Sequence, residues 1–162
     1  MEKQPISEKL IRFQDCDPMG HLNNARYIDY FMNAREDHLS DHYALNIYEI
    51  MKNDGRAWVV GKNEILYRTP ALLMENVKIR TQVVHFSKRK ILVEMAMFNA
   101  KMSHLKSLMW SVFIPVDVRS QKSSEHEADI MELLEKVNVP IEEKQIEERL
   151  QRIESELGVH SI

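Results

Sequence analysis

The order of periodic segments along the chain predicts an α+β fold with five strands around one long helix. An apolar stretch at residues 6–13 precedes a broad apolar stripe at helical spacing over residues 24–42. Four segments follow in which β-forming residues alternate with polar ones, as in half-buried strands. Short linkers separate the last three, so these should form an antiparallel meander. A strand, a helix and four strands in this order are typical of an antiparallel sheet wrapped on a helix.

Each expected element has its own pattern. Asn23 and Asn24 are typical N-cap residues and precede the helix over residues 24–42. Residues 44–53 are ambiguous and allow one short helical turn before Asn53-Asp54-Gly55. The four later strands are expected at residues 57–68, 77–86, 91–99 and 105–116, with hairpin loops at 87–90 and 101–104.

The C-terminal residues differ in character from the rest of the chain. Residues 120–127 are polar and loop-like, and a helix should follow that ends near Asn138-Val139-Pro140. A second helix carries Ile146, Leu150, Ile153 and Leu157 as a narrow apolar seam in a charged background. The seam is expected to pack on the core or on a second subunit, and the alternative is a helix that binds another partner.

Composition limits the class of protein. At 162 residues with 44% apolar and 29% charged residues, the chain should form one globular domain. A net charge of −3 argues against a dedicated nucleic-acid binder. The chain has no apolar run of about 18 residues, so no membrane span is expected. A single cysteine, Cys16, and an N-terminal sequence without the apolar core of a signal peptide predict a cytoplasmic protein.

The most informative segment joins the first strand to the helix. Asp15 and Asp17 precede turn-forming residues that end at Gly20, and a helix then opens at Asn23 or Asn24. A carboxylate is thereby expected beside a helix N-terminus, where free backbone N–H groups face the same place. That arrangement suits a carbonyl group that develops negative charge.

This segment resembles the signature of a known enzyme family. Residues 13–20 match the pattern F-x-D-x-D-P-x-G of hotdog-fold acyl-CoA thioesterases of the 4-hydroxybenzoyl-CoA thioesterase type, and residues 20–24 match its G-H-x-N-N variant. The resemblance covers roughly residues 6–118 and includes Leu66-Tyr67-Arg68-Thr69-Pro70-Ala71. It implies a hotdog thioesterase domain at residues 1–118, whereas residues 119–162 form a helical extension of that domain without a family counterpart.

The resemblance also implies an activity and an assembly. The substrate is expected to be an acyl-CoA, hydrolysed without a metal or redox cofactor. The open edge and face of a five-stranded sheet predict a homodimer or homotetramer, and the resemblance places the active site at the subunit interface.

Residue roles follow partly from the resemblance. Asp17 matches the catalytic carboxylate, although spacing alone would favour a role as the cap of its own turn. The backbone N–H of Asn24 matches the oxyanion donor. His21 has two alternatives, a catalytic role and a structural loop histidine. Asp15 is expected to support the loop, and Cys16 has no evident base that would make it a nucleophile.

Other candidates carry weaker signals. Lys88, Arg89 and Lys90 can contact the phosphates of coenzyme A or simply form a solvated hairpin, and the same alternatives hold for Arg119 with Lys122. His38 and His42 are spaced i, i+4 but lack a third ligand, so they are expected to be solvent-exposed on the polar face of the helix rather than metal ligands. Methionines on the strands, Met95, Met97 and Met109 among them, can line an acyl pocket or fill the core.

Two rival functions remain from the sequence. A non-catalytic module that binds acyl thioesters would keep the fold without using Asp17. A hotdog dehydratase or hydratase would need a catalytic histidine paired with an acid, which His21 supports only thinly. The acyl group, and the choice between coenzyme A and acyl carrier protein as thiol, are left open by the sequence.

Overall fold

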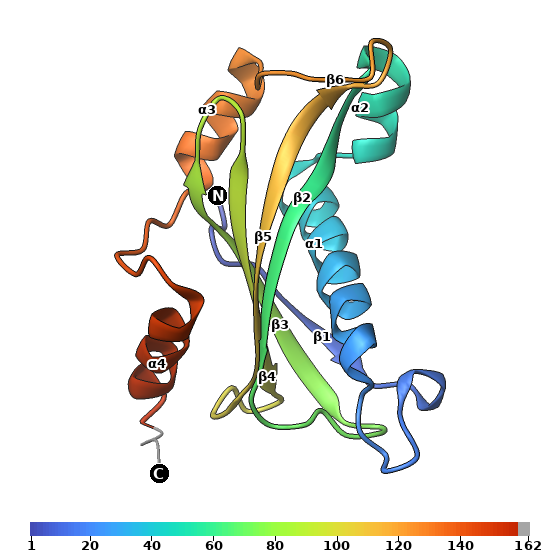
Figure 1. Cartoon of the computed structure of the whole chain (residues 1–162), viewed down its shortest axis with the longest axis vertical. Coiled ribbons are helices and arrows are strands. Elements are labelled where there is room, and N and C mark those ends of the chain that lie inside the picture. The colour runs from blue at the N-terminus through green and yellow to red at the C-terminus, as the bar shows by residue number, and fades with distance from the viewer. Residues whose placement is uncertain (159–162) are drawn as a thin grey trace.

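A curled antiparallel sheet around one helix dominates the computed structural model, which describes residues 1–158 (Figure 1). The strand order is β1-β3-β4-β5-β2, and all neighbouring strands pair antiparallel. The strands are β1 (Ile6–Leu10), β2 (Arg56–Tyr67), β3 (Asn76–Phe86), β4 (Ile91–Asn99) and β5 (Leu105–Asp117), with the short β6 (Lys122–Ser123) beside β5. The helices are α1 (Tyr27–Tyr43), α2 (Ile47–Asp54), α3 (Ala128–Val137) and α4 (Ile146–Glu156). The predicted α+β class and meander are confirmed, and all five predicted strands are present, with the two-residue β6 in addition.

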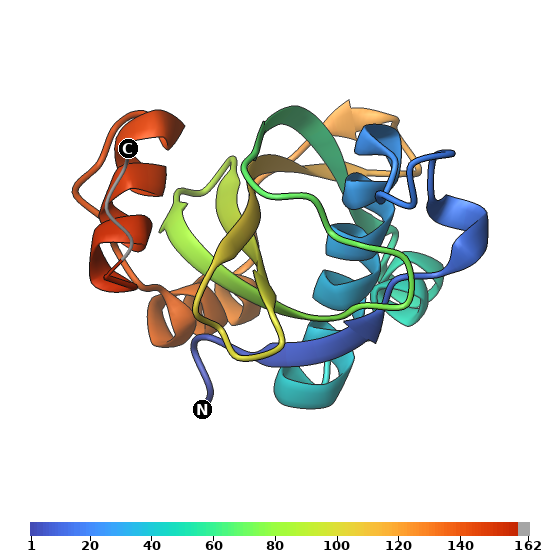
Figure 2. The same cartoon turned by 90° about the horizontal axis from the view of Figure 1, so that it is seen from below.

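The inner face of the sheet packs on α1. Seen from below, the strands curl around this helix while α4 lies outside them (Figure 2). Tyr27, Phe31 and Ala34 on α1 are fully or almost fully buried in the main core, together with Met95 and Met109 from the central strands. The strand methionines therefore fill the core, which was one of their two predicted roles.

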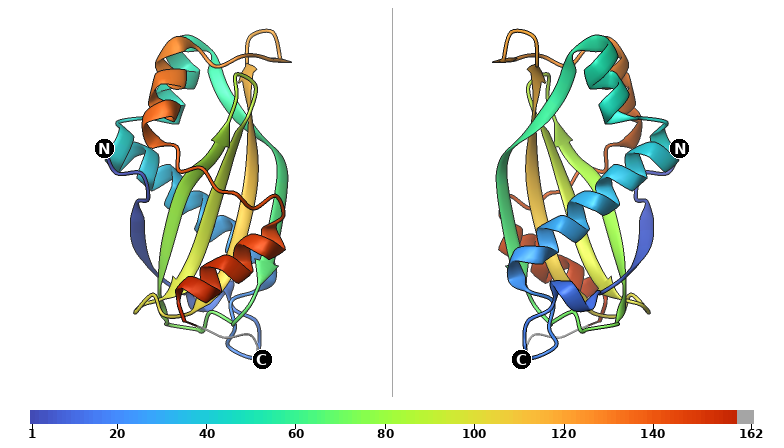
Figure 3. Two further views of the ribbon diagram at one scale, coloured as in Figure 1. Left: turned by 90° about the vertical axis from the view of Figure 1, so that its left-hand side faces the viewer. Right: turned by 90° about the vertical axis from the view of Figure 1, so that its right-hand side faces the viewer.

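Part of the outer face of the sheet is covered by α4. Figure 3 shows α4 across the strands on one side and α1 on the other. The predicted seam is confirmed, because Ile146, Leu150 and Ile153 are buried against a second core cluster that includes Phe98 and Trp110. The C-terminal extension therefore packs on its own chain, as one of its alternatives predicted.

Two local predictions differ from the structure. Residues 44–53 hold a helix of eight residues, α2, whose N-cap Asn46 accepts hydrogen bonds from the amides of Tyr48 and Glu49. The segment expected to be a loop after residue 120 contains β6. None of the helices within residues 1–158 is long and apolar enough to cross a membrane.

The prediction that His38 is solvent-exposed is wrong. His38 is only 1% exposed, because α1 turns this side chain toward β1 and β3. Its ring nitrogens lie 2.8 Å from Oγ1 of Thr81 and 3.1 Å from Oγ of Ser7. His42, one turn later, is exposed as expected. Within the described residues, no three His, Cys, Asp or Glu side chains gather closely enough to hold a metal ion.

Candidate active site

The loop between β1 and α1 is organised by Asp17. Its Oδ1 accepts hydrogen bonds from the backbone N–H groups of Met19 (2.9 Å) and His21 (3.1 Å), and its carbonyl oxygen accepts from the N–H of Gly20 (3.0 Å). Gly20 has φ +76°, a left-handed conformation that glycine adopts without strain. Oδ2 of Asp17 makes no hydrogen bond within residues 1–158. The half-buried carboxylate therefore caps its turn with one oxygen and keeps the other available.

Asp15 ties this loop to α1. Its Oδ2 accepts a 2.6 Å hydrogen bond from the hydroxyl of Tyr30, and that hydroxyl accepts one from the N–H of Arg12. Burial, followed by the hydrogen bond to Asp15, raises the pKa of Tyr30 to about 12, so the hydroxyl stays protonated and donates. The contact matches the supporting role predicted for Asp15.

The thiol of Cys16 lies between the two acids and donates to the carbonyl oxygen of Arg12 (3.4 Å). Desolvation raises the pKa of Cys16, and the charges of Asp15 and Asp17 raise it further. A higher thiol pKa means less thiolate at neutral pH, so the environment disfavours a nucleophilic cysteine.

The helix start presents a free amide. Asn23 is the predicted N-cap, and its side chain accepts from the N–H of Ala25 (3.1 Å). Asn24 begins a 3₁₀ turn, Asn24–Arg26, that leads into α1. Within residues 1–158 the N–H of Asn24 donates no hydrogen bond, whereas its carbonyl oxygen accepts from the hydroxyl of Tyr67 (2.8 Å). An N–H at this position can donate to an anionic oxygen.

A second loop, residues 68–75, holds the first one in place. The N–H of Leu22 donates to the carbonyl of Ala71 and that of Leu73 to the carbonyl of Gly20, both at 2.8 Å. The hydroxyl of Tyr27 accepts from the N–H of Ala71 (3.0 Å). Backbone hydrogen bonds thus join the loop that carries the candidate residues to residues 68–75, and the Tyr27 hydroxyl joins residues 68–75 to α1.

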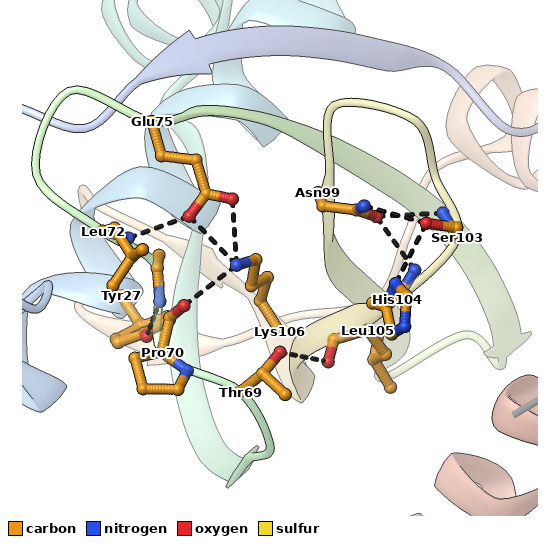
Figure 4. Close-up of polar contacts among 11 residues, drawn as sticks. Tyr27, Thr69, Pro70, Leu72, Glu75, Asn99, Ser103, His104, Leu105 and Lys106 are labelled. Carbon is orange, nitrogen blue, oxygen red and sulfur yellow. Dashed lines mark hydrogen bonds and ion pairs between the residues drawn. The ribbon is translucent and has the colours of Figure 1, made fainter. Parts of the chain in front are cut away.

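A nearly buried ion pair supports this second loop (Figure 4). Nζ of Lys106 lies 2.9 Å from a Glu75 carboxylate oxygen and donates to the carbonyl of Pro70 (2.9 Å). Glu75 also accepts from the N–H of Leu72 (2.9 Å). Sequence analysis missed Lys106 and Glu75, because their pairing joins a loop residue to a strand residue that is far away along the chain.

The family of the chain follows from comparison with known proteins. The model of the thioesterase-like superfamily matches residues 11–134, most of the chain. The chain belongs to this superfamily. The predicted family resemblance and the prediction of a thioester hydrolase are confirmed at this level.

Individual relatives agree with this membership. The chain is 25% identical over 127 residues to the long-chain acyl-CoA thioesterase FadM of Escherichia coli, covering 78% of this chain and 94% of FadM. It resembles the DHNA-CoA thioesterase of Staphylococcus aureus with a TM-score of 0.75 and 23% identity, over 83% and 90% of the two chains. The SAV2348 protein of Staphylococcus aureus, solved in complex with CoA, matches with a TM-score of 0.77 and 13% identity, over 100% of this chain and 96% of that one. The hotdog fold is confirmed.

The three predicted catalytic residues lie together in the structure, in the segment between β1 and α1. Asp17, His21 and Asn24 lie within one loop and helix start. The backbone of His21 pairs with Leu72, and its imidazole makes no hydrogen bond with any residue between 1 and 158. The ring is half-buried, which leaves both predicted roles of His21 open.

The residues predicted to contact the phosphates of coenzyme A lie far from the Asp17 loop. Lys88, Arg89 and Lys90 form the β3–β4 hairpin, which is at the opposite end of the sheet from the Asp17 loop (Figure 1). Arg89 pairs there with Glu125 at 3.3 Å. Arg119 is also at that end and donates to the carbonyl of Asn53 (3.3 Å). One chain alone therefore does not bring these cations to Asp17.

Other cations do lie beside the loop. A polar groove next to the Asp15–Tyr30 contact is lined by Lys9, Arg12 and Arg26. Lys9 and Arg26 pair with the acids Asp37 and Asp29. Sequence analysis did not single out these cations, because they are spread over two elements and form no run along the chain.

Proposed function

We propose that the protein hydrolyses acyl-CoA thioesters to a free acid and coenzyme A, with the carboxylate of Asp17 as general base or nucleophile. Superfamily membership supports the reaction class, and the likeness to FadM supports coenzyme A as the thiol. The observation that carries the residue assignment is the loop itself, in which a carboxylate with one unbonded oxygen precedes, in the same short segment, a helix start with a free amide.

Two routes are compatible with this geometry. In the first, Asp17 accepts a proton from a water molecule while the water oxygen bonds to the thioester carbonyl carbon. In the second, Asp17 itself bonds to that carbon and the resulting anhydride is hydrolysed. In both routes the carbonyl oxygen becomes an oxyanion that accepts from the N–H of Asn24, and cleavage of the C–S bond releases the thiolate of coenzyme A. Neither route needs a metal or a redox cofactor.

We further propose that two copies associate along β2. This strand is an edge of the sheet, and Val59 and Val60 on it are 48% and 45% exposed. Antiparallel pairing about a two-fold axis would extend the sheet across both copies. It would also bring the end that carries Lys88, Arg89 and Lys90 in one copy towards the Asp17 loop of the other, where these cations could meet phosphates of coenzyme A.

The strongest rival is a module that binds acyl thioesters without hydrolysing them. The two hydrogen bonds from Met19 and His21 to Asp17 favour it, because they would serve a purely structural turn. A dehydratase is less favoured, since the His21 imidazole has no acidic partner among the residues that the structure describes.

Substitution of Asp17 by Asn separates catalysis from capping. Asparagine keeps an Oδ1 that can accept from both loop amides, but it is neither a base nor a carboxylate nucleophile. If Asp17 is catalytic, Asp17→Asn should lower kcat on a responsive acyl-CoA by at least about 100-fold. The assay is thiol release from a panel of acyl-CoA thioesters, with thermal unfolding of both proteins as the check on folding.

The matched control is Asp15→Asn, which weakens the contact with Tyr30 and should reduce stability as much as rate. Full activity in a folded Asp17→Asn protein would reject the catalytic assignment. A wild-type protein that releases no thiol from any member of the panel would favour the binding module instead.

A further inference from the structure

An apolar cavity of about 260 Å³ lies at the end of α1 remote from the Asp17 loop. It lies between α1, α2, α3 and the inner face of the sheet, with Leu39, Trp58, Phe113 and Leu133 among its walls. It opens to solvent beside α2, where Met51 is 44% exposed. Its volume equals that of about nine waters at ~30 Å³ each, so it has room for an apolar occupant.

The polar side chains of the wall are engaged outside the cavity. Arg35, its one charged lining residue, donates to Oγ1 of Thr81 (3.3 Å). The hydroxyl of Tyr43 donates to the carbonyl of Glu2 (2.9 Å), and Nε1 of Trp58 donates to Nε2 of His126 (3.1 Å). The cavity therefore offers an occupant mainly carbon, which favours an apolar group.

The C-terminal extension supplies one wall and is fixed over the cavity. Arg56, at the start of β2, lies 3.1 Å from Asp129 at the start of α3. His126, just before α3, binds Trp58 through one ring nitrogen and the carbonyl of Ser87 (2.9 Å) through the other. After α3, the N–H of Val139 donates to the carbonyl of Val83 (2.8 Å). The wall is thus held at both ends.

The proposed dimer would bring the cavity of one copy to the loop of the other. Within one chain, Leu39 lies twelve residues beyond Tyr27, or ~18 Å along the helix. Antiparallel pairing of two β2 strands about their midpoint places the Tyr67 end of one copy beside the Arg56 end of the other. The hydroxyl of Tyr67 donates a hydrogen bond to the carbonyl oxygen of Asn24, so the Tyr67 end of β2 adjoins the Asp17 loop. Trp58 lies on the cavity wall, so the Arg56 end of β2 adjoins the cavity.

We propose that this cavity holds the apolar tail of the acyl group, delivered from the Asp17 loop of the other copy, and that α3 sets the length of tail accepted. The proposal rests on the proposed thioesterase function. The volume suits a tail of roughly eight to ten carbon atoms, since a methylene group is about as large as a water. Residues of the extension would then determine which acyl-chain length is accepted, whereas the Asp17 loop would carry out the hydrolysis.

The test fills the cavity from α3. Leu133→Trp places a larger side chain on its wall, and Glu135→Trp adds the same side chain to an exposed position of the same helix. Thiol release is measured with decanoyl-CoA and acetyl-CoA, and decanoate binding is measured by calorimetry. Leu133→Trp should lower the decanoyl-to-acetyl ratio of kcat/KM at least about tenfold and weaken decanoate binding, whereas Glu135→Trp should keep both.

Leu133→Ala provides a second variant in case the tryptophan disturbs folding. It enlarges the same wall and should shift the preference from decanoyl-CoA towards dodecanoyl-CoA. The inference is overturned if the wild type is active but neither Leu133 variant changes the chain-length profile or the decanoate affinity. Failure of the proposed function looks different, because the wild type would then release thiol from no ester at all.

Discussion

His38 shows how a single buried side chain can link the fold to pH. It bridges α1 to Thr81 of β3 and Ser7 of β1. Burial lowers the pKa of His38 to about 4, and the positive charge of Arg35 adds to the effect. The neutral imidazole is therefore the form that the folded protein prefers.

Stability should fall as the solution is acidified through this range. Between the unfolded-state pKa of about 6.5 and the folded-state value of about 4, the unfolded chain binds more protons at this site. Acidification from pH 7 to pH 4 should therefore lower the free energy of unfolding by up to about 3 kcal/mol through this histidine. Urea unfolding of wild type and His38→Gln at pH 7 and pH 4.5 measures this, and the variant should lose less stability on acidification.

His42→Gln is the matched control for that experiment. It removes an exposed histidine one turn along the same helix. Its pH dependence should follow that of the wild type. A His38→Gln protein with an unaltered loss of stability on acidification would contradict the role assigned to His38.

At the residue scale, sequence analysis predicted the motif better than its surroundings. Asp17, Gly20 and Asn23 could be assigned because turn and cap chemistry is local. His38 was misplaced because helical spacing put it on a polar face, and only the curl of the sheet brings β1 over that face. Lys106 and Glu75 meet through tertiary structure, which no local pattern encodes.

At the element scale, α4 is held by charge as well as by its apolar seam. Glu94, on β4, is 1% exposed and accepts from Gln82, Trp110 and Arg149. Nε of Arg149, from α4, lies 2.8 Å from its carboxylate. The cluster satisfies a buried carboxylate only while α4 is in place.

Loss of the Arg149 side chain should therefore be costly. Arg149→Met leaves the buried carboxylate of Glu94 without its cation, and removing one partner of a buried pair typically costs about 3 kcal/mol or more. The matched change Arg152→Met breaks an exposed pair with Glu156 on the same helix and should cost at most about 0.5 kcal/mol. Urea unfolding of the two variants measures both values, and equal losses would contradict the special position of Arg149.

The elements themselves were predicted to within a few residues. The strand limits were clear because alternation ends at polar hairpins, as at residues 87–90. The apolar seam of α4 predicted a helix but not the face of the sheet on which it packs. Because β4 carries apolar residues on both faces, α4 could have packed on either one. The two-residue β6 is too short to leave a periodic pattern.

At the scale of the whole molecule, the helices within residues 1–158 leave one long edge of the sheet uncovered. The inner face of the sheet is covered by α1, and α4 covers part of the outer face, which reduces the area left for sheet-on-sheet packing of two copies. Of the two edges, β1 has five residues and β2 has twelve. Longer exposed edges are the better templates for pairing, which favours a dimer along β2 over a tetramer built through the outer face.

A charge placed on this edge should separate the two copies. Val60→Lys puts a solvated cation where the proposed interface is apolar and should raise the dimer Kd at least about tenfold, or 1.4 kcal/mol. Ile6→Lys makes the same change at a residue that is 44% exposed on the other edge, and it should leave association unaltered. Light scattering across a dilution series, with specific activity measured on the same samples, tests both.

Because the proposed site joins the loop of one copy to the cavity of the other, activity should fall in step with the dimer fraction. A Val60→Lys protein that is monomeric and fully active would refute the shared site, whereas dissociation by Ile6→Lys alone would move the interface to β1.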